Sequence, residues 1–371
     1  MAGNNKFYFP TLDGFRALAA VFILLYHSGF SYFKTLWIGV PMFFVLSGFL
    51  ITLILSENKH ATNYFKAFYF KRSLRIFPIY YLALAFSIIW GLLTHADLSQ
   101  LPYFIFYLQN FLISTDAQPY YCYGLMGHTW SLSVEECFYL VWPFIVYSLN
   151  QKKLFYVSFI IGTCSILFKV VVLLFFYTTT TGQLLILSFI GSLDGLMAGA
   201  LLAIMVLNKE VFGKTDLLSR RSFYIVISAF VIVLLFNCKS FAEVFYLVLN
   251  RVLLNTMTVI ASFYVLTRFI SPSGMSVLFY KIFTHPALRF IGKISYGLYL
   301  YHFIIYRVLD ACFYHYNIHL LPFYTLLFKI LLTFIVSVIS WFCIEKPILK
   351  LKNILDYQSK AGNSKALTWE G

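Results

Sequence analysis

Arg16 and His27 lie in a segment that is otherwise apolar enough to enter a membrane, LDGFRALAAVFILLYH. At about 100° per residue their side chains fall within roughly 20° of each other on one helix face, about 16 Å apart along the axis. That rise is about half the hydrocarbon thickness of a bilayer. Ionisable groups at such depth are costly and ordinarily face an interior cavity, so the pair indicates a functional site.

A second cluster is the segment KRSLRIFPIYY, in which Arg72 and Arg75 are three residues apart. This spacing puts both on one helical face at the start of a predicted span. Arginine binds phosphate through two parallel hydrogen bonds, so the pair could hold a polyphosphate that arrives from the cytosol. Ordinary anchoring by positive residues on the cytoplasmic side accounts for the pair equally well.

The third cluster is GHTWSLSVEECFYLVWP, where Glu135 and Glu136 fall in or near the first turns of an apolar helix. Ser133 and Glu136 have the spacing of a capping box, so the acids could serve the helix start. A buried carboxylate could instead orient a histidine or accept a hydroxyl proton. Two acids are more than one cap needs, which favours the functional interpretation.

The fourth cluster is IGKISYGLYLYHFII, in which Tyr296, Tyr299 and His302 recur at helical spacing. They could line an aromatic groove, or they could pack within the protein and contribute to an interfacial aromatic belt. For His302, in mid-span, a satisfied buried histidine is the alternative to a catalytic one.

The elements that position these residues are membrane helices. The 371 residues are 61% hydrophobic, 20% aromatic and only 11% charged, a balance that excludes soluble globular classes and predicts an all-α polytopic membrane protein. The net charge of +14 does not indicate nucleic-acid binding, because the basic residues lie between apolar spans. The six cysteines have no metal-binding spacing and fall mostly in apolar runs, so we expect no metal site.

Ten segments have about the length that a bilayer requires. They are 14–32, 36–56, 76–94, 131–149, 154–177, 184–207, 222–237, 252–270, 291–311 and 321–343. The apolar stretch 101–113 is short, so we expect an interfacial or re-entrant helix there. With a cytoplasmic N-terminus, segments on the cytoplasmic side carry 21 basic residues and those outside carry four, which predicts that both termini are cytoplasmic.

This orientation places Arg16 near the cytoplasmic mouth of the first span and His27 deeper, towards its outer half. Lys169 and Lys329 lie within spans, about two turns from their outer ends. Snorkelling of the ammonium groups to the membrane surface is the expected explanation for both lysines.

Taken in order, the four clusters and three further segments, MFFVLSGFLIT, DGLMAGALLA and IEKP, resemble the successive signatures of the bacterial membrane acyltransferase 3 family. The resemblance runs from about residue 11 to 347. Its most specific parts are an arginine and a histidine with ten residues between them, and the SLSVEE block.

The resemblance implies an O-acyltransferase of the bacterial inner membrane that moves an acyl group, usually acetyl, from acyl-CoA to a hydroxyl of a cell-envelope carbohydrate, such as lipopolysaccharide or exopolysaccharide. His27 would be the catalytic base and Arg16 its partner, while Arg72 and Arg75 would meet the CoA phosphates. The remaining positions that match the active cavity are Glu135 and Glu136 as acids, with Trp130, Ser133, Tyr139, Asn110, His128, His302 and Tyr299 as cavity residues. Acetyl-CoA, the carbohydrate and the lipid bilayer are the expected partners.

Two departures from the family pattern bear on acceptor specificity. Pro41-Met42 replaces the usual Val-Asp, and Asp194 lacks the arginine often found just before it. We expect residues 1–347 to form one transmembrane domain and residues 348–371 a short cytoplasmic tail, with no appended extracytoplasmic domain.

In the expected chemistry, an imidazole with an ordinary pKa of about 6.5 takes the proton of a sugar hydroxyl while that hydroxyl attacks the thioester. A relay through an acyl-histidine is the alternative to direct transfer. The rival class is a transporter of small anionic solutes, which ten spans with intramembrane charges would also suit, although no paired broken helices are evident. A lipid-linked glycosyltransferase would need more acidic residues in its outer loops.

Overall fold

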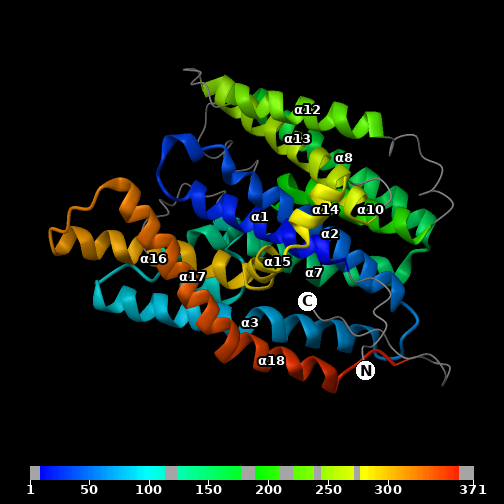
Figure 1. Cartoon of the computed structure of the whole chain (residues 1–371). Helices are drawn as coiled ribbons and strands as arrows, with labels where there is room; N and C mark the ends of the chain where they lie inside the picture. The colour runs from blue at the N-terminus through cyan, green and yellow to red at the C-terminus, as the bar shows by residue number, and fades with distance from the viewer. Residues whose placement is uncertain are drawn as a thin grey trace.

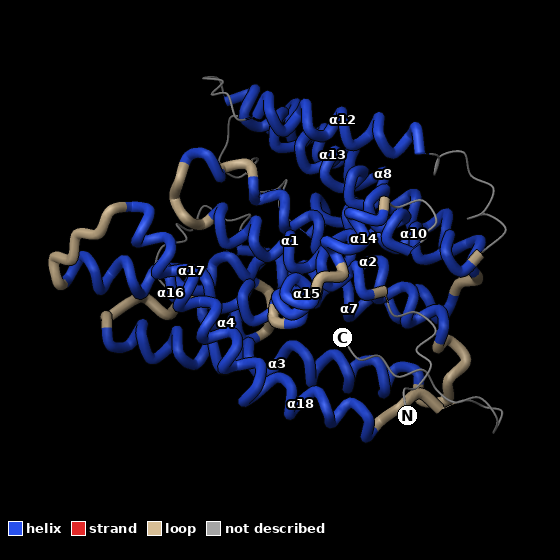
Figure 2. Tube along the Cα trace, viewed as in Figure 1, coloured by secondary structure: helices blue, strands red, loops and turns tan. Residues whose placement is uncertain are grey.

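The structure, a computed structural model, describes residues 9–112, 123–176, 189–208, 220–237, 244–270 and 276–358. Within these residues every regular element is a helix, as Figures 1 and 2 show. The long helices are α1 (Pro10–Tyr26), α2 (Gly39–Glu57), α3 (Tyr64–Leu93), α7 (Trp130–Ser148), α8 (Gln151–Phe176), α10 (Phe189–Leu207), α12 (Arg220–Asn237), α13 (Val244–Ile270), α16 (Ser295–His315) and α17 (Pro322–Ser340).

Short helices connect or extend these. They are α4 (Leu101–Ile105), α5 (Gln109–Leu112), α6 (Tyr123–Met126), α14 (Val277–Phe283), α15 (Pro286–Lys293) and α18 (Lys346–Lys350), with a π-helical turn at Trp341–Glu345 that joins α17 to α18. The described part of the predicted stretch 101–113, residues 101–112, thus holds two helices of five and four residues, too short to cross a bilayer. The prediction that it is not a further span is confirmed.

Six helical segments among the described residues are long and apolar enough to cross a membrane. They are Ser31–Glu57, Tyr64–Leu93, Gln151–Phe175, Phe189–Leu207, Val252–Ile270 and Pro322–Ile354. A helix also lies at each of the other four predicted positions, in α1, α7, α12 and α16. Of these, α1 has only 17 residues, and α7 carries two adjacent glutamates.

Two predicted boundaries differ from the structure in ways that matter for the site. Helix α3 begins at Tyr64 rather than near residue 76, because the aromatic residues before the arginines continue the helix; Arg72 and Arg75 therefore lie well inside it. Helix α1 ends at Tyr26, and Gly29 beyond it has a φ of +84°, a left-handed conformation that glycine adopts readily. His27 is consequently the C-terminal cap of α1, at the end of the helix.

Helices α1 and α2 lie at the centre of the bundle, with α8, α10 and α13 on one side and α3 and α16 on the other (Figure 1). The backbones of α2 and α10 approach closely at two glycines. A Cβ on Gly48 would collide with the carbonyl oxygen of Leu196, and one on Gly199 with that of Val45. Small residues of this kind let helices pack tightly in membranes, and here they hold α2 in place beside the site.

Helices α8 and α10 are joined by an ion pair inside the protein. Lys169 Nζ lies 2.5 Å from Asp194 Oδ2, and the two side chains are 0% and 3% exposed. Asn255 of α13 also donates to this carboxylate, at 3.2 Å. The snorkelling interpretation is therefore wrong for Lys169, which supplies the cation that Asp194 appeared to lack from the sequence. Lys329 is also paired, with Asp310 at 2.6 Å, but that aspartate is 55% exposed.

Replacing Lys169 by methionine should destabilise the protein by about 3–5 kcal/mol, because it leaves a buried carboxylate without its cation. We expect the double variant Lys169→Met, Asp194→Leu to recover much of this loss, since it removes both charges. Thermal unfolding of the detergent-purified protein measures both. Lys329→Met is the matched control, with a smaller loss because its partner is exposed; equal losses for the two single variants would contradict the prediction.

Candidate functional site

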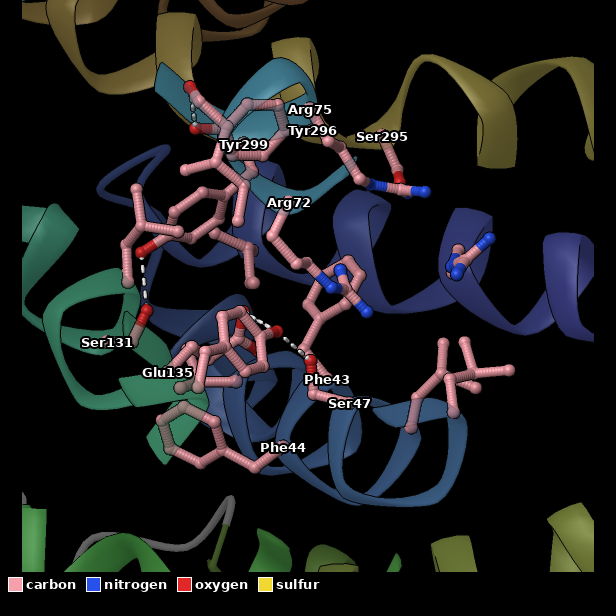
Figure 3. Close-up of a pocket in the computed structure, with 18 residues that line it drawn as sticks. Phe43, Phe44, Ser47, Arg72, Arg75, Ser131, Glu135, Ser295, Tyr296 and Tyr299 are labelled. Atoms are coloured by element: carbon pink, nitrogen blue, oxygen red, sulfur yellow. Dashed lines mark hydrogen bonds between the residues drawn. The ribbon is translucent and has the colours of Figure 1, made fainter. Parts of the chain in front are cut away.

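Side chains of helices α1, α2, α3, α7 and α16 line a cavity of about 100 Å³, named here the arginine cavity. Arg16 of α1 and Arg72 and Arg75 of α3 all line it, opposite Ser47 of α2 and Glu135 of α7. Figure 3 shows Arg72 reaching from α3 into the cavity towards the groups of Ser47 and Glu135. Three guanidinium groups around one cavity make it suited to an anion with several phosphates.

A hydrogen-bonded chain crosses the arginine cavity between α2 and α7. Ser47 Oγ lies 2.7 Å from the Tyr139 hydroxyl, which donates to Glu135 Oε2 at 3.0 Å. The guanidinium of Arg72 stacks over the Tyr139 ring, 4.8 Å from its centroid. Arg16 is held within its own helix by Asp13, with 3.4 Å between Nη1 and Oδ1. Two of the three arginines that line the cavity, Arg16 and Arg72, are thus oriented by specific contacts.

A second cavity, of about 90 Å³, is named here the histidine cavity. His27, His128 and three aromatic side chains, Tyr26, Trp37 and Trp130, line it. Both cavities are lined in addition by Ile23, Val40 and Tyr299, so they adjoin each other across these side chains. Arg16 and His27, three helical turns apart on α1, therefore belong to neighbouring cavities.

Tyr299 of α16 stands at the boundary of the two cavities. Its hydroxyl lies 2.7 Å from Ser131 Oγ of α7 and donates to the carbonyl oxygen of His128 at 2.5 Å. Figure 3 marks the bond to Ser131. Because Ser131 and His128 flank the start of α7, these bonds tie that helix end to α16.

The three histidines that the sequence singled out are brought together. His302 Nε2 lies 3.1 Å from His27 Nδ1, and the rings of His128 and His302 have their centroids 5.0 Å apart. His302 is fully buried behind His27 and lines neither cavity. His128 Nε2 contacts the carbonyl oxygen of Leu300 at 3.2 Å.

Three other predicted residues lie outside both cavities. Ser133 Oγ is buried, 2.5 Å from the carbonyl oxygen of Tyr107 and 2.6 Å from Asn110 Oδ1, so Ser133 and Asn110 join α7 to the segment before it. Glu136 lies next to Glu135 but lines neither cavity. Because α7 begins at Trp130, neither acid caps the helix, which removes the helix-start explanation for the pair.

The sequence reasoning missed several lining residues. Ser47 and Trp37 carried no signal, since a serine in an apolar helix and a tryptophan before one are common. The ion pair between Arg16 and Asp13 could have been predicted from the sequence, because the two residues are three apart on one helix.

Comparisons with known proteins show a family match over most of the chain. The model of the acyltransferase 3 family, described as an acyltransferase domain, matches residues 9–342. The chain is 28% identical over 364 residues to the peptidoglycan O-acetyltransferase OatA of Listeria monocytogenes, covering 93% of this chain and 56% of the relative. It is 26% identical over 377 residues to the O-acetyltransferase OatA of Staphylococcus aureus strain NCTC 8325, covering 92% and 57%.

A further relative from Staphylococcus aureus strain COL is 29% identical over 363 residues, with 92% of this chain and 58% of the relative covered. The chain thus spans less than three-fifths of the length of these relatives. No solved structure matches the chain.

Replacing Tyr139 by phenylalanine should lower the free energy of unfolding by about 1–3 kcal/mol, because the hydroxyl that joins Ser47 to the Glu135 carboxylate is lost while the ring under Arg72 remains. Thermal unfolding of the purified protein measures this. Tyr147→Phe on the same helix is the control, since Tyr147 is 50% exposed. An unfolding midpoint that is the same for both variants would contradict the prediction.

Proposed function

Because the chain belongs to the acyltransferase 3 family, we propose that it is a membrane O-acyltransferase that transfers an acetyl group from acetyl-CoA to a hydroxyl of a cell-envelope carbohydrate. The observation that carries this proposal is the pair of adjoining cavities, one with three arginines and one with two histidines. The first suits the phosphates of the donor, and the second suits proton transfer from the acceptor.

The donor occupies the arginine cavity in this proposal. Arg72 and Arg75 bind the phosphates of CoA, and the thioester extends towards Tyr299 and the histidine cavity. An arginine fork binds phosphate in bidentate fashion, which a flexible ammonium group cannot do. Arg16 lines the same cavity as the two arginines of α3, where it is available to stabilise charge that develops on the donor.

The acceptor carbohydrate occupies the histidine cavity, against Tyr26, Trp37 and Trp130. His27 Nε2 takes the proton of the attacking hydroxyl, the new ester bond forms at the thioester carbonyl, and the carbon–sulfur bond breaks. The proton then passes to the departing CoA sulfur. General-base assistance of this kind typically contributes about 10²–10⁴-fold, so positioning by the two cavities supplies the remainder.

The proposed orientation in the membrane rests on the charge distribution. Ten membrane helices with both termini cytoplasmic place the arginine cavity on the cytosolic side, where acyl-CoA is present, and His27 nearer the outer side. The excess of basic residues in the cytoplasmic segments supports this orientation. The bacterial inner membrane is the proposed location, with residues 1–347 as the transmembrane domain and residues 348–371 as a cytoplasmic tail.

The acceptor is proposed to be a polymer of the cell envelope. One relative is named a peptidoglycan O-acetyltransferase, which supports an envelope carbohydrate as the acceptor class. The aromatic lining of the histidine cavity supports the same class, because a flat aromatic face packs against the apolar face of a sugar ring.

Replacing His27 by alanine should abolish acetylation, because the base that takes the hydroxyl proton is lost. The test uses a host strain that lacks the chain, complemented with wild type or variant. Base-labile acetate released from its purified envelope polysaccharide is measured, together with the amount of protein in the membrane. His315→Ala is the control, since His315 is exposed on α16. Substantial acetylation by the His27 variant would overturn the proposed function.

Arg72→Gln and Arg75→Gln should each raise the KM for acetyl-CoA by about 10- to 100-fold, the loss expected for a charged hydrogen bond. Initial rates in detergent-solubilised membranes give the KM, with radiolabelled acetyl-CoA as donor and envelope polysaccharide from the strain lacking the chain as acceptor. Lys34→Gln is the control, because Lys34 is exposed beyond the C-terminal end of α1 and lines neither cavity. Label that crosses vesicle membranes without attachment to polysaccharide would favour the transporter alternative.

A further inference from the structure

His302 is placed behind His27, away from both cavities and with no exposed surface. Its two ring nitrogens contact different partners. Nδ1 lies 2.6 Å from the carbonyl oxygen of Tyr299, and Nε2 lies 3.1 Å from Nδ1 of His27. The pair of imidazoles, with ring centroids 4.9 Å apart, is thus connected on its far side to the backbone of α16.

These contacts determine which nitrogen carries the proton in each neutral ring. A carbonyl oxygen only accepts, so His302 Nδ1 must be the N–H donor to Tyr299, and its Nε2 carries the lone pair. His27 Nδ1 faces that lone pair and also the carbonyl oxygen of Ile23 at 3.1 Å. Both neighbours are acceptors, so the proton of neutral His27 is on Nδ1 and the lone pair is on Nε2.

The carbonyl oxygen of Ile23 is only a partial acceptor for the Nδ1 proton of His27. It already accepts the backbone N–H of His27, at 3.2 Å, and therefore shares its lone pairs between two donors. The His302 Nε2 lone pair has His27 as the partner that the structure records. His302 is accordingly the acceptor that is free to strengthen its bond when His27 becomes charged.

We propose that His302 is a positioning residue for the transfer reaction: it holds the ring of His27 with Nε2 as the base and stabilises the imidazolium that forms. This rests on the proposed function, in which His27 takes the hydroxyl proton. In that step the proton moves from the hydroxyl to His27 Nε2, while the Nδ1 proton remains in the bond to His302 Nε2. The hydrogen bond becomes charge-assisted, and such bonds are roughly twice as strong as neutral ones.

The surroundings of the pair favour this role. The Phe303 ring packs edge-on against His27 and, tilted by 34°, against His128, with centroids 5.0 and 5.1 Å away. Phe303 thereby adds an apolar surface beside the bond between the two imidazoles. A hydrogen bond in such apolar surroundings is electrostatically stronger than one in water. Tyr299, whose carbonyl oxygen accepts from His302, is itself fixed in place. Its hydroxyl bonds to Ser131 and to the carbonyl oxygen of His128 at the start of α7.

The test compares two amides at position 302. In His302→Gln the amide reaches the place of Nε2 and can accept from His27, whereas in His302→Asn the amide reaches only the place of Nδ1 and keeps the bond to Tyr299. Initial rates with radiolabelled acetyl-CoA and envelope polysaccharide from the strain lacking the chain give kcat and KM. We expect a kcat at least about tenfold higher for Gln than for Asn, and an unchanged KM for acetyl-CoA.

His302→Leu and His315→Gln complete the set. The leucine variant should lose at least as much kcat as asparagine, and the control on the same helix should match wild type. A purely structural role for His302 predicts equal rates for Gln and Asn once protein amounts are matched, and that outcome would overturn the inference. Wild-type kcat in His302→Leu would also overturn it, while activity in His27→Ala would instead overturn the proposed function.

Discussion

A guanidinium and an imidazole on an apolar helix have to be enclosed by other helices, because lipid offers neither of them a hydrogen-bond partner. Arg16 and His27 impose this requirement on α1, and the bundle meets it by packing α1 against α2, α15 and α16. The two cavities are the result. Each keeps either Arg16 or His27 inside the protein and brings further polar groups from neighbouring helices towards it.

One turn of α16 organises the region between the cavities. Tyr299 closes the boundary with its ring, holds α7 with its hydroxyl and accepts from His302 with its carbonyl oxygen. Leu300 accepts from His128 through its carbonyl oxygen. Backbone carbonyls inside a helix are ordinarily satisfied by that helix, so their second contacts to imidazoles let α16 orient the histidines through its backbone.

Helices α8 and α10, on the side of the bundle away from α3 and α16, hold α2 in position. Glycine contacts bring α2 and α10 together, and the buried bond between Lys169 and Asp194 joins α10 to α8. Ser47 lies next to Gly48 on α2, so the close approach at that glycine also positions the hydroxyl that contacts Tyr139. A buried charge without its partner strongly destabilises a protein. Both members of this pair are therefore required by the scaffold, even though they lie outside the two cavities.

The sequence by itself determined the helical class and the membrane character. It also identified Arg16, His27, Arg72, Arg75 and Glu135 as candidate site residues, because hydrophobic runs and helical spacing are local properties. Local patterns could not set where α3 begins, since aromatic residues outside the apolar window continue that helix. They also assigned Lys169 to the membrane surface, because its partner Asp194 is 25 residues away on another helix. Only the tertiary structure decided that Glu135 rather than Glu136 lines a cavity, that Ser133 packs away from it, and that His302 contacts His27 across 275 residues of chain, since each depends on how separate helices pack.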